Sequence, residues 1–156
     1  MTEICNFSFS LQGWNIVCNK SLNADDCKQG YTYLRNQSET FEDFAPKLAF
    51  LPPLKSRRLS DSARLFFEAE WDLVGENADM PVVYASSNSE MNRNFALWHS
   101  LLKEGDVSPT SFSLSVHNAL IGQWSELRQV KSETTSIMAR VDNLETALLE
   151  ATLLLN

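Results

Sequence analysis

A helix pattern with apolar residues on nearly every side ends the sequence, in the stretch DNLETALLEATLLLN (Asp142–Asn156). Six leucines and two alanines occupy most of the circumference of this helix. A helix that is apolar all round is typically buried on several sides. Any fold of this chain therefore has to place its last helix between other elements.

Three earlier stretches have the composition of strands. MPVVYASS (Met80–Ser87) and TTSIMARV (Thr134–Val141) are short runs rich in apolar or β-branched residues, which fit buried strands. FSFSLQGWNIVC (Phe7–Cys18) alternates well enough for one or two further strands, whereas residues 19–53 are polar and irregular.

Helical spacing of apolar residues fills the intervals. One helix is predicted from Ser60, with Ser60 or Ser62 as its cap, and another after the capping-box spacing Ser87-x-x-Glu90. A third region, from Phe112 to Leu127, has apolar residues at helix spacing. The apolar positions are Leu65, Phe66, Ala69, Leu73 and Val74 in the first, Met91, Phe95, Trp98 and Leu102 in the second, and Phe112, Val116, Ala119, Leu120, Trp124 and Leu127 in the third. Strands that alternate with helices predict an α/β layered domain.

The length and charge of the chain restrict its class. At 156 residues one domain buries roughly 70% of its unfolded surface, so a single domain over residues 1–156 is expected. The net charge of −7 gives no electrostatic reason to bind nucleic acid or an anionic membrane. No run of about 18 apolar residues predicts a membrane span, and the first residues do not resemble a signal peptide. We therefore expect a cytoplasmic protein.

The three cysteines, Cys5, Cys18 and Cys27, all precede the readable strands and helices of the second half. They form no CxxC pair and no histidine cluster lies near them, so they are interpreted as reduced thiols. The sequence predicts neither a metal site nor a cofactor.

One set of motifs carries a resemblance to a known family. It consists of VSP (Val107–Pro109), Asn118, Gly122, the strand through Ile137 and the helix LETALLEA, preceded by RRLSDSARL and VVYASS. This arrangement resembles the N-terminal half of the beta-ketoacyl synthases, over roughly residues 60–156. The resemblance implies the thiolase fold: a mixed sheet packed with helices and a central helix buried between two sheets. The chain would then be one ketoacyl-synthase-like N-terminal domain, or a truncated half of the fold.

The resemblance also shows what this chain lacks. The family's nucleophilic cysteine begins the central helix, at a position matched here by Val141, and ARVDNLE (Ala139–Glu145) contains no Cys, Ser or Gln. The family's Gly-Pro before that strand is replaced by Ser132-Glu133, and the half that supplies its catalytic histidines is not present. Thioester condensation needs a thiolate and imidazoles. The resemblance therefore implies a pseudoenzyme, similar to the chain-length-factor-like proteins of type II systems such as those that make aryl polyenes.

Such a protein is expected to form a heterodimer with an active ketosynthase and to shape the acyl tunnel in polyketide, aryl polyene or fatty-acid-like biosynthesis. It would meet the acyl carrier protein only indirectly. The residues that the resemblance assigns to the acyl tunnel and partner are Thr110, Ser111 and Phe112, and those assigned to the dimer interface are Asn118, Ile137, Met138 and Val141. Phe112 has an alternative interpretation as an anchor of its own helix.

Two other functions stay open. The chain is alternatively a small α/β binding module of unrelated ancestry, or a divergent condensing enzyme that uses one of its three cysteines. His99 and His117 have no Cys or carboxylate at a useful spacing and are interpreted as structural. The run LKSRR (Leu54–Arg58) either receives an acidic carrier protein or is a solvated surface. Helix capping explains Asp142 and Glu145 better than an acid pair does.

Overall fold

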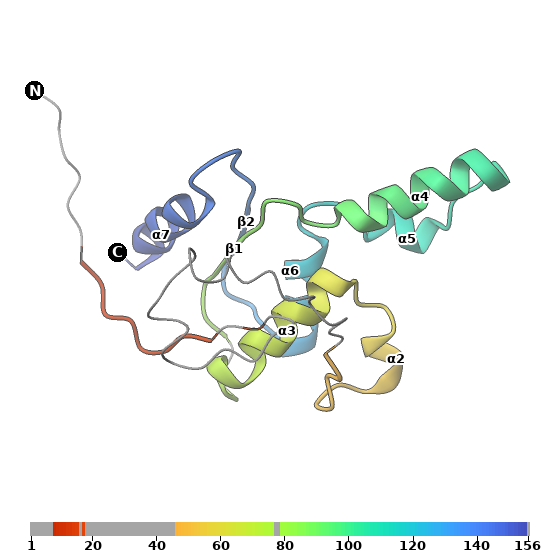
Figure 1. Cartoon of the computed structure of the whole chain (residues 1–156). Helices are drawn as coiled ribbons and strands as arrows, with labels where there is room; N and C mark the ends of the chain where they lie inside the picture. Colours follow the sequence, from red (N-terminus) through yellow and green to blue (C-terminus); the bar gives the residue numbers. More distant parts are fainter. Residues whose placement is uncertain (1–7, 16, 18–45, 77–78, 156) are drawn as a thin grey trace, which may run out of the picture. The chain divides into compact units, whose positions relative to one another are not determined.

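The computed structural model describes residues 8–15, 17, 46–76 and 79–155. The elements in these residues are α2 (Pro53–Ser56), α3 (Asp61–Val74), β1 (Val82–Ala85), α4 (Met91–Glu104), α5 (Pro109–Ser113), α6 (Ala119–Arg128), β2 (Thr134–Ile137) and α7 (Asn143–Leu154) (Figure 1). They form two compact units, one of residues 13–73 and one that contains residues 74–155. The α/β class predicted from the sequence is confirmed. None of the helices within the described ranges is long and apolar enough to cross a membrane.

The first unit is built around α3. The backbone N–H of Ala63 donates to Ser60 Oγ at 3.1 Å, which confirms Ser60 as one of the two predicted caps. Ala63 and Phe67 are fully buried, and Phe50 stacks on Trp71 with ring centroids 4.4 Å apart.

The buried face of α3 differs from the predicted one. Leu65 and Leu73, which were expected to face the core, are exposed, whereas Phe67 and Trp71 take part in the aromatic cluster. The physical reason is the contact with Phe50, which belongs to a segment without a readable pattern. The spacing of apolar residues in α3 alone allows either face of the helix to be buried.

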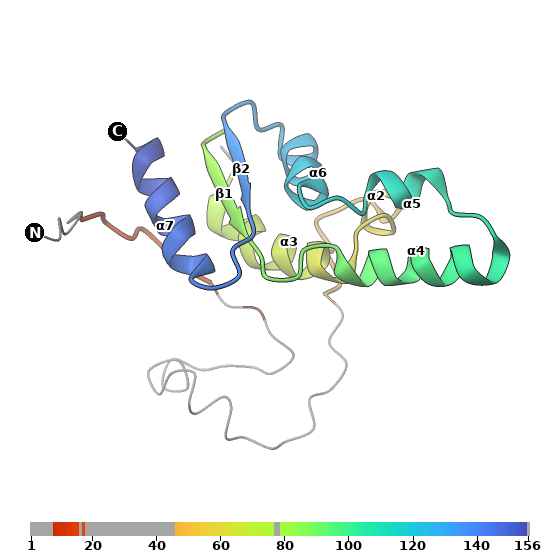
Figure 2. The same cartoon turned by 90° about the horizontal axis from the view of Figure 1, so that it is seen from above.

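The second unit contains a parallel strand pair. Val82 of β1 pairs with Thr134 of β2, and the register continues to Ala85 and Ile137. Figure 2 shows α7 on one side of the pair and α6 on the other. Both strands lie inside the predicted stretches and are shorter than predicted. The strand prediction over Phe7–Cys18 is wrong for residues 8–15, which form no strand, and its remainder lies mostly outside the described residues.

The helical spacing from Phe112 to Leu127 is divided between two helices, because the chain leaves the helical path between α5 and α6. Ser113 Oγ donates to the carbonyl of Thr110 at 2.9 Å, and Ser115 Oγ donates to that of Phe112 at 2.8 Å. Serine hydroxyls that bind nearby backbone carbonyls compete with helix formation, which accounts for the break.

The last helix, α7, begins and ends close to the predicted positions. It packs against β1 and β2, but none of its residues is buried within the described chain. Leu144 and Leu153 are both more than 60% exposed. This differs from the expectation of a helix buried on several sides, because the strand pair covers one flank only.

Candidate functional site

Val141 lies in the turn between β2 and α7, at the position that the family resemblance matches to a nucleophile. Its side chain is 68% exposed, and Met138 on the same turn is also exposed. Asp142, the next residue, has a left-handed backbone with φ of 59° and makes no side-chain cap to α7. The capping role predicted for Asp142 is therefore wrong, although the residue does stand at the N-cap position.

Asn143 fixes the conformation of this turn. Its Oδ1 accepts a hydrogen bond from the backbone N–H of Ala139 at 2.6 Å, and its Nδ2 donates to Ser87 Oγ at 2.9 Å. Ser87 follows β1 and Ala139 follows β2, so one amide side chain joins the loops at the carboxyl ends of both strands. The sequence analysis missed this role because Asn143 and Ser87 are 56 residues apart.

The turn from Met138 to Asp142 carries no Cys, Ser or His side chain. An aliphatic side chain, Val141, stands at the position that the resemblance matches to the nucleophile, and the charged groups Arg140 and Asp142 are exposed. No group of three or more His, Cys, Asp or Glu residues in the described part of the chain is placed to hold a metal ion. Cys5, Cys18 and Cys27 lie outside the described residues. The geometry of the turn suits a contact surface.

A second candidate surface is the hairpin formed by α4 and α5. The two helices lie side by side and extend away from the strand pair (Figures 1 and 2). The apolar residues predicted to face the core from α4 are exposed, with Trp98 at 61% and Leu102 at 78%. The orientation inferred for this helix is therefore wrong within the described chain. Phe112, on α5, is 63% exposed.

A cavity of about 250 Å³ lies between the two helices of the hairpin. Its lining consists of Asn94, Leu97, Trp98, Leu101, Val107 and Phe112. Ser108 caps α5 by accepting a hydrogen bond from the N–H of Ser111 at 3.3 Å. Phe112 lines the cavity and is also exposed. Its position is therefore compatible with an anchor of its own helix and with a contact to the acyl tunnel or a partner.

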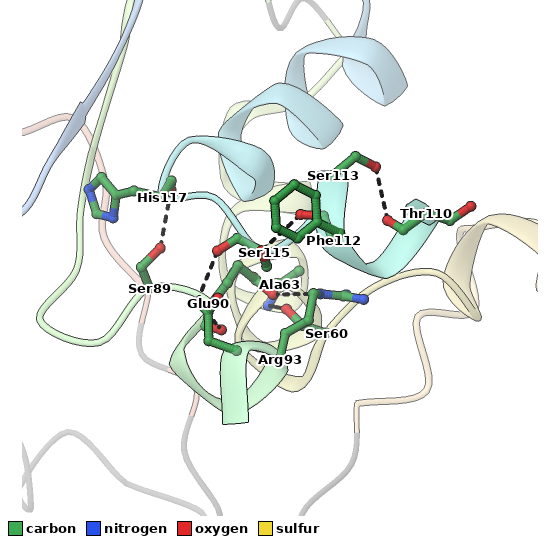
Figure 3. Close-up of polar contacts among 11 residues, drawn as sticks. Ser60, Ala63, Ser89, Glu90, Arg93, Thr110, Phe112, Ser113, Ser115 and His117 are labelled. Carbon is green, nitrogen blue, oxygen red and sulfur yellow. Dashed lines mark hydrogen bonds and ion pairs between the residues drawn. The ribbon is translucent and has the colours of Figure 1, made fainter. Parts of the chain in front are cut away.

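Polar contacts fix the base of the hairpin. Asn94 Nδ2 donates to the carbonyls of Glu90 and Ser115, at 3.2 and 3.0 Å. Ser89 Oγ donates to the carbonyl of His117 at 3.2 Å (Figure 3). These bonds tie the start of α4 to the segment between α5 and α6.

The carboxylate of Glu90 is buried and pairs with Arg93 Nε at 3.1 Å (Figure 3). Glu90 is itself the N-cap residue of α4 and makes no side-chain cap, so the predicted capping box from Ser87 is wrong. Ser86 Oγ instead accepts the N–H of Ser89 at 2.7 Å. This local turn replaces the capping box because Ser86 follows β1 directly.

His117 lies in the segment between α5 and α6. Its ring centroid is 6.3 Å from that of Tyr84, and burial raises the pKa of the Tyr84 phenol. Both ring nitrogens of His117 are buried and have no hydrogen-bond partner among the residues that the structure describes. The other histidine, His99, is exposed on α4. Neither imidazole therefore belongs to a catalytic pair with a described group.

The residues assigned to a dimer interface lie in two places. Ile137 ends β2 and is half-buried, and Met138 and Val141 continue from it on the exposed turn. Asn118 stands apart from them at the N-cap of α6. β2 pairs with β1 along one edge, and no described strand pairs with its other edge.

Comparison with known families decides the relationship. The model of the beta-ketoacyl synthase N-terminal domain matches residues 32–156. The chain belongs to the beta-ketoacyl synthase N-terminal domain family. The match begins well before the residues that carry the sequence resemblance, and it excludes a binding module of unrelated ancestry.

One solved structure of another protein is similar to this chain. It is the ketosynthase ApeO in complex with its chain length factor ApeC, from Xenorhabdus doucetiae. One chain of it is similar to this family member with a TM-score of 0.78 and 24% identity, over 96% of this chain and 63% of that chain. This chain therefore spans about 63% of the length of its structural relative. The thiolase-like fold expected from the resemblance is confirmed. No curated protein matches the sequence.

Proposed function

We propose that this chain is a non-catalytic, chain-length-factor-like partner of an active ketosynthase. The observation that carries the proposal is Val141, an exposed aliphatic residue at the position matched to the nucleophile of the family. Condensation by an acyl-enzyme needs a thiolate at that position. Acyl transfer would accordingly take place on the partner, in a polyketide, aryl polyene or fatty-acid-like pathway of the cytoplasm.

The exposed apolar surface of the second unit supports a heterodimer. Groups of exposed apolar side chains on a protein surface favour a partner that covers them. The hairpin exposes Trp98, Leu102 and Phe112, and the turn before α7 exposes Met138 and Val141. We assign Thr110, Ser111 and Phe112 to the wall of the acyl tunnel, and Asn118, Ile137, Met138 and Val141 to the interface with the ketosynthase. The carrier protein would then dock mainly on the ketosynthase.

Co-purification tests this assignment. The chain should form a one-to-one complex with a ketosynthase from the same host, measured by light scattering after co-expression. Met138→Asp should weaken that complex by at least about tenfold, because a carboxylate buried at an apolar interface is strongly disfavoured. Lys103→Ala, a change at another exposed residue of the unit, should leave the complex intact.

The activity of the isolated chain is the second part of this test. Neither the native chain nor Val141→Cys should condense acyl groups by itself, because His117 makes no side-chain hydrogen bond to a described group and His99 lies exposed on α4. Condensation by the purified single chain would contradict the proposal. So would a monomer that remains indifferent to the ketosynthase at high concentration.

A further inference from the structure

The imidazole of His117 is a buried titratable group that the proposed function does not use. Neither Nδ1 nor Nε2 is accessible to solvent, and neither bonds to a residue that the structure describes. The ring lies beside Tyr84 of β1, with the ring centroids 6.3 Å apart. A neutral imidazole presents one N–H donor and one acceptor, whereas its cation presents two donors and a charge. Burial without partners therefore disfavours the cation far more than the neutral ring.

The backbone around His117 joins elements that are distant in the sequence. The carbonyl of His117 accepts hydrogen bonds from Ser89 Oγ at 3.2 Å and from Ser136 Oγ at 3.4 Å. Ser89 lies just before α4, and Ser136 belongs to β2. The carbonyl of Ser115 accepts a further bond from Asn94 Nδ2 at 3.0 Å. The segment of residues 114–118 thus holds the start of α4 next to β2, and its displacement would remove these bonds.

The described elements around His117 offer no anion to an imidazolium. β2 and α5 contain no ionisable side chain, the first turn of α6 contains no acidic residue, and β1 contains only Tyr84. Burial raises the pKa of the Tyr84 phenol, which therefore stays uncharged. The carboxylate of Glu90 is paired with Arg93 Nε at 3.1 Å, and in Figure 3 the imidazole points away from both. A cation at His117 would have no counter-charge in this part of the described chain.

We propose that the segment 114–118 is an acid-sensitive latch for the α4–α5 hairpin, with His117 as the group that senses pH. While the imidazole is neutral, it lies beside Tyr84 and its carbonyl holds the start of α4. When the imidazole takes up a proton, the segment leaves its place so that the cation reaches water, and the bonds from Ser89 and Asn94 are broken. The latch is a property of this chain alone and does not depend on the proposed ketosynthase partner.

Proton linkage gives the size of the expected effect. An imidazole exposed by opening of the latch is half-protonated at about pH 6.5. If the closed latch holds only the neutral ring, the equilibrium constant for opening increases about tenfold between about pH 7.5 and about pH 5.5. The closed state is therefore fully favoured above this range of pH and progressively less favoured as the pH falls through it.

Hydrogen exchange of the full chain, measured by mass spectrometry at about pH 7.5 and about pH 5.5, tests the latch. His117→Phe keeps an aromatic ring beside Tyr84, and His117→Gln keeps a polar side chain, but neither variant titrates in this range. Intrinsic exchange rates cancel when native and variant chains are compared at the same pH. Relative to both variants, exchange in α4 and α5 of the native chain should rise about tenfold on acidification.

The other histidine of the chain supplies a matched control. His99 lies exposed on α4, so His99→Gln should retain the acid-dependent exchange of the native chain. An equal response to pH in the native chain and in the His117 variants would overturn the latch, and so would loss of the response in His99→Gln.

A measurement on the native chain avoids substitution altogether. The Hε1 proton resonance of His117 should stay constant in NMR spectra between about pH 7.5 and about pH 6, while that of His99 shifts. Equal shifts of the two resonances without faster exchange in α4 would mean that the cation is tolerated in place, and the latch would be rejected. No ketosynthase takes part in either experiment, so these outcomes are separate from the test of the proposed function.

Discussion

The helices α6 and α4 follow the same rule of apolar spacing and have opposite surroundings. In α6 the residues Leu120, Ile121 and Trp124 are all at most 2% exposed. In the longer α4 no residue is buried, and Trp98 is 61% exposed. Each helix contains a tryptophan within its apolar pattern, so sequence alone gives the two residues the same expected environment.

The difference shows what an apolar pattern does and does not specify. Helical periodicity identifies the face that avoids water, but it does not identify the element that covers that face. For α6 the described chain supplies the cover. For α4 it does so only through α5, whose few residues leave most of the apolar face exposed. We infer that the missing cover of α4 comes from a partner, consistent with the proposed heterodimer.

The largest expected effect separates the two tryptophans by stability. Trp124→Ala should lower the free energy of unfolding by about 3–5 kcal/mol, because it leaves a cavity around a side chain that is 1% exposed. Trp98→Ala should lower it by no more than about 1 kcal/mol. Urea denaturation of the two single variants, followed by circular dichroism, measures both values.

The affinity for the ketosynthase should depend on Trp98 more than on Trp124, the opposite of the order for stability. Trp98→Ala should weaken the complex, whereas a Trp124 variant that remains folded should not act at the interface directly. If both alanine variants lost the same stability, the helix α4 would be covered in solution, and the contrast with α6 would be incorrect.

The elements that the sequence predicted best depend on local signals. β-branched runs located β1 and β2, and the cap at Ser60 located the start of α3, because these preferences act within a few residues. The α/β class then followed from the order of these elements.

The features that the sequence did not reveal depend on contacts between distant segments. Asn143 bonds to Ser87 across 56 residues, and Asn94 bonds to Ser115 across 21. An amide side chain has many possible partners, so its residue type does not predict which one it binds. The exposure of α7 is of the same kind, because it depends on how much sheet is available to cover the helix.

A middle-sized effect tests whether polar contacts hold α4 in place where apolar packing does not. Asn94→Ala removes the two bonds to the carbonyls of Glu90 and Ser115 and should cost about 1–2 kcal/mol. Hydrogen exchange should rise in α4 and α5 and remain unchanged in α6. Asn92→Ala, at an exposed position on the same helix, is the matched control and should leave exchange as it is. Faster exchange in all three helices would show that the hairpin and α6 unfold as one unit.

The smallest expected effect concerns Asp79, in the segment before β1. Asp79 Oδ1 accepts hydrogen bonds from the backbone N–H groups of Lys131 and Ser132, both at 2.8 Å, and so joins the segments before β1 and β2. The bond from Lys131, followed by those from Ser132, lowers the pKa of this carboxyl below its ordinary value of 3.8.

A lowered pKa in the folded state means that the stabilisation is present above pH 3.8 and is lost as the pH falls through the folded-state pKa. Asp79→Asn should therefore lower Tm slightly near neutral pH, and the difference from the native chain should shrink as the pH falls below 3.8. Asp72→Asn makes the same change of charge at an exposed position of α3 and should not reproduce this trend. A difference in Tm that stayed constant with pH would mean that Asp79 acts through shape alone, and the strand pair beneath α6 would then depend on apolar burial without help from this carboxylate.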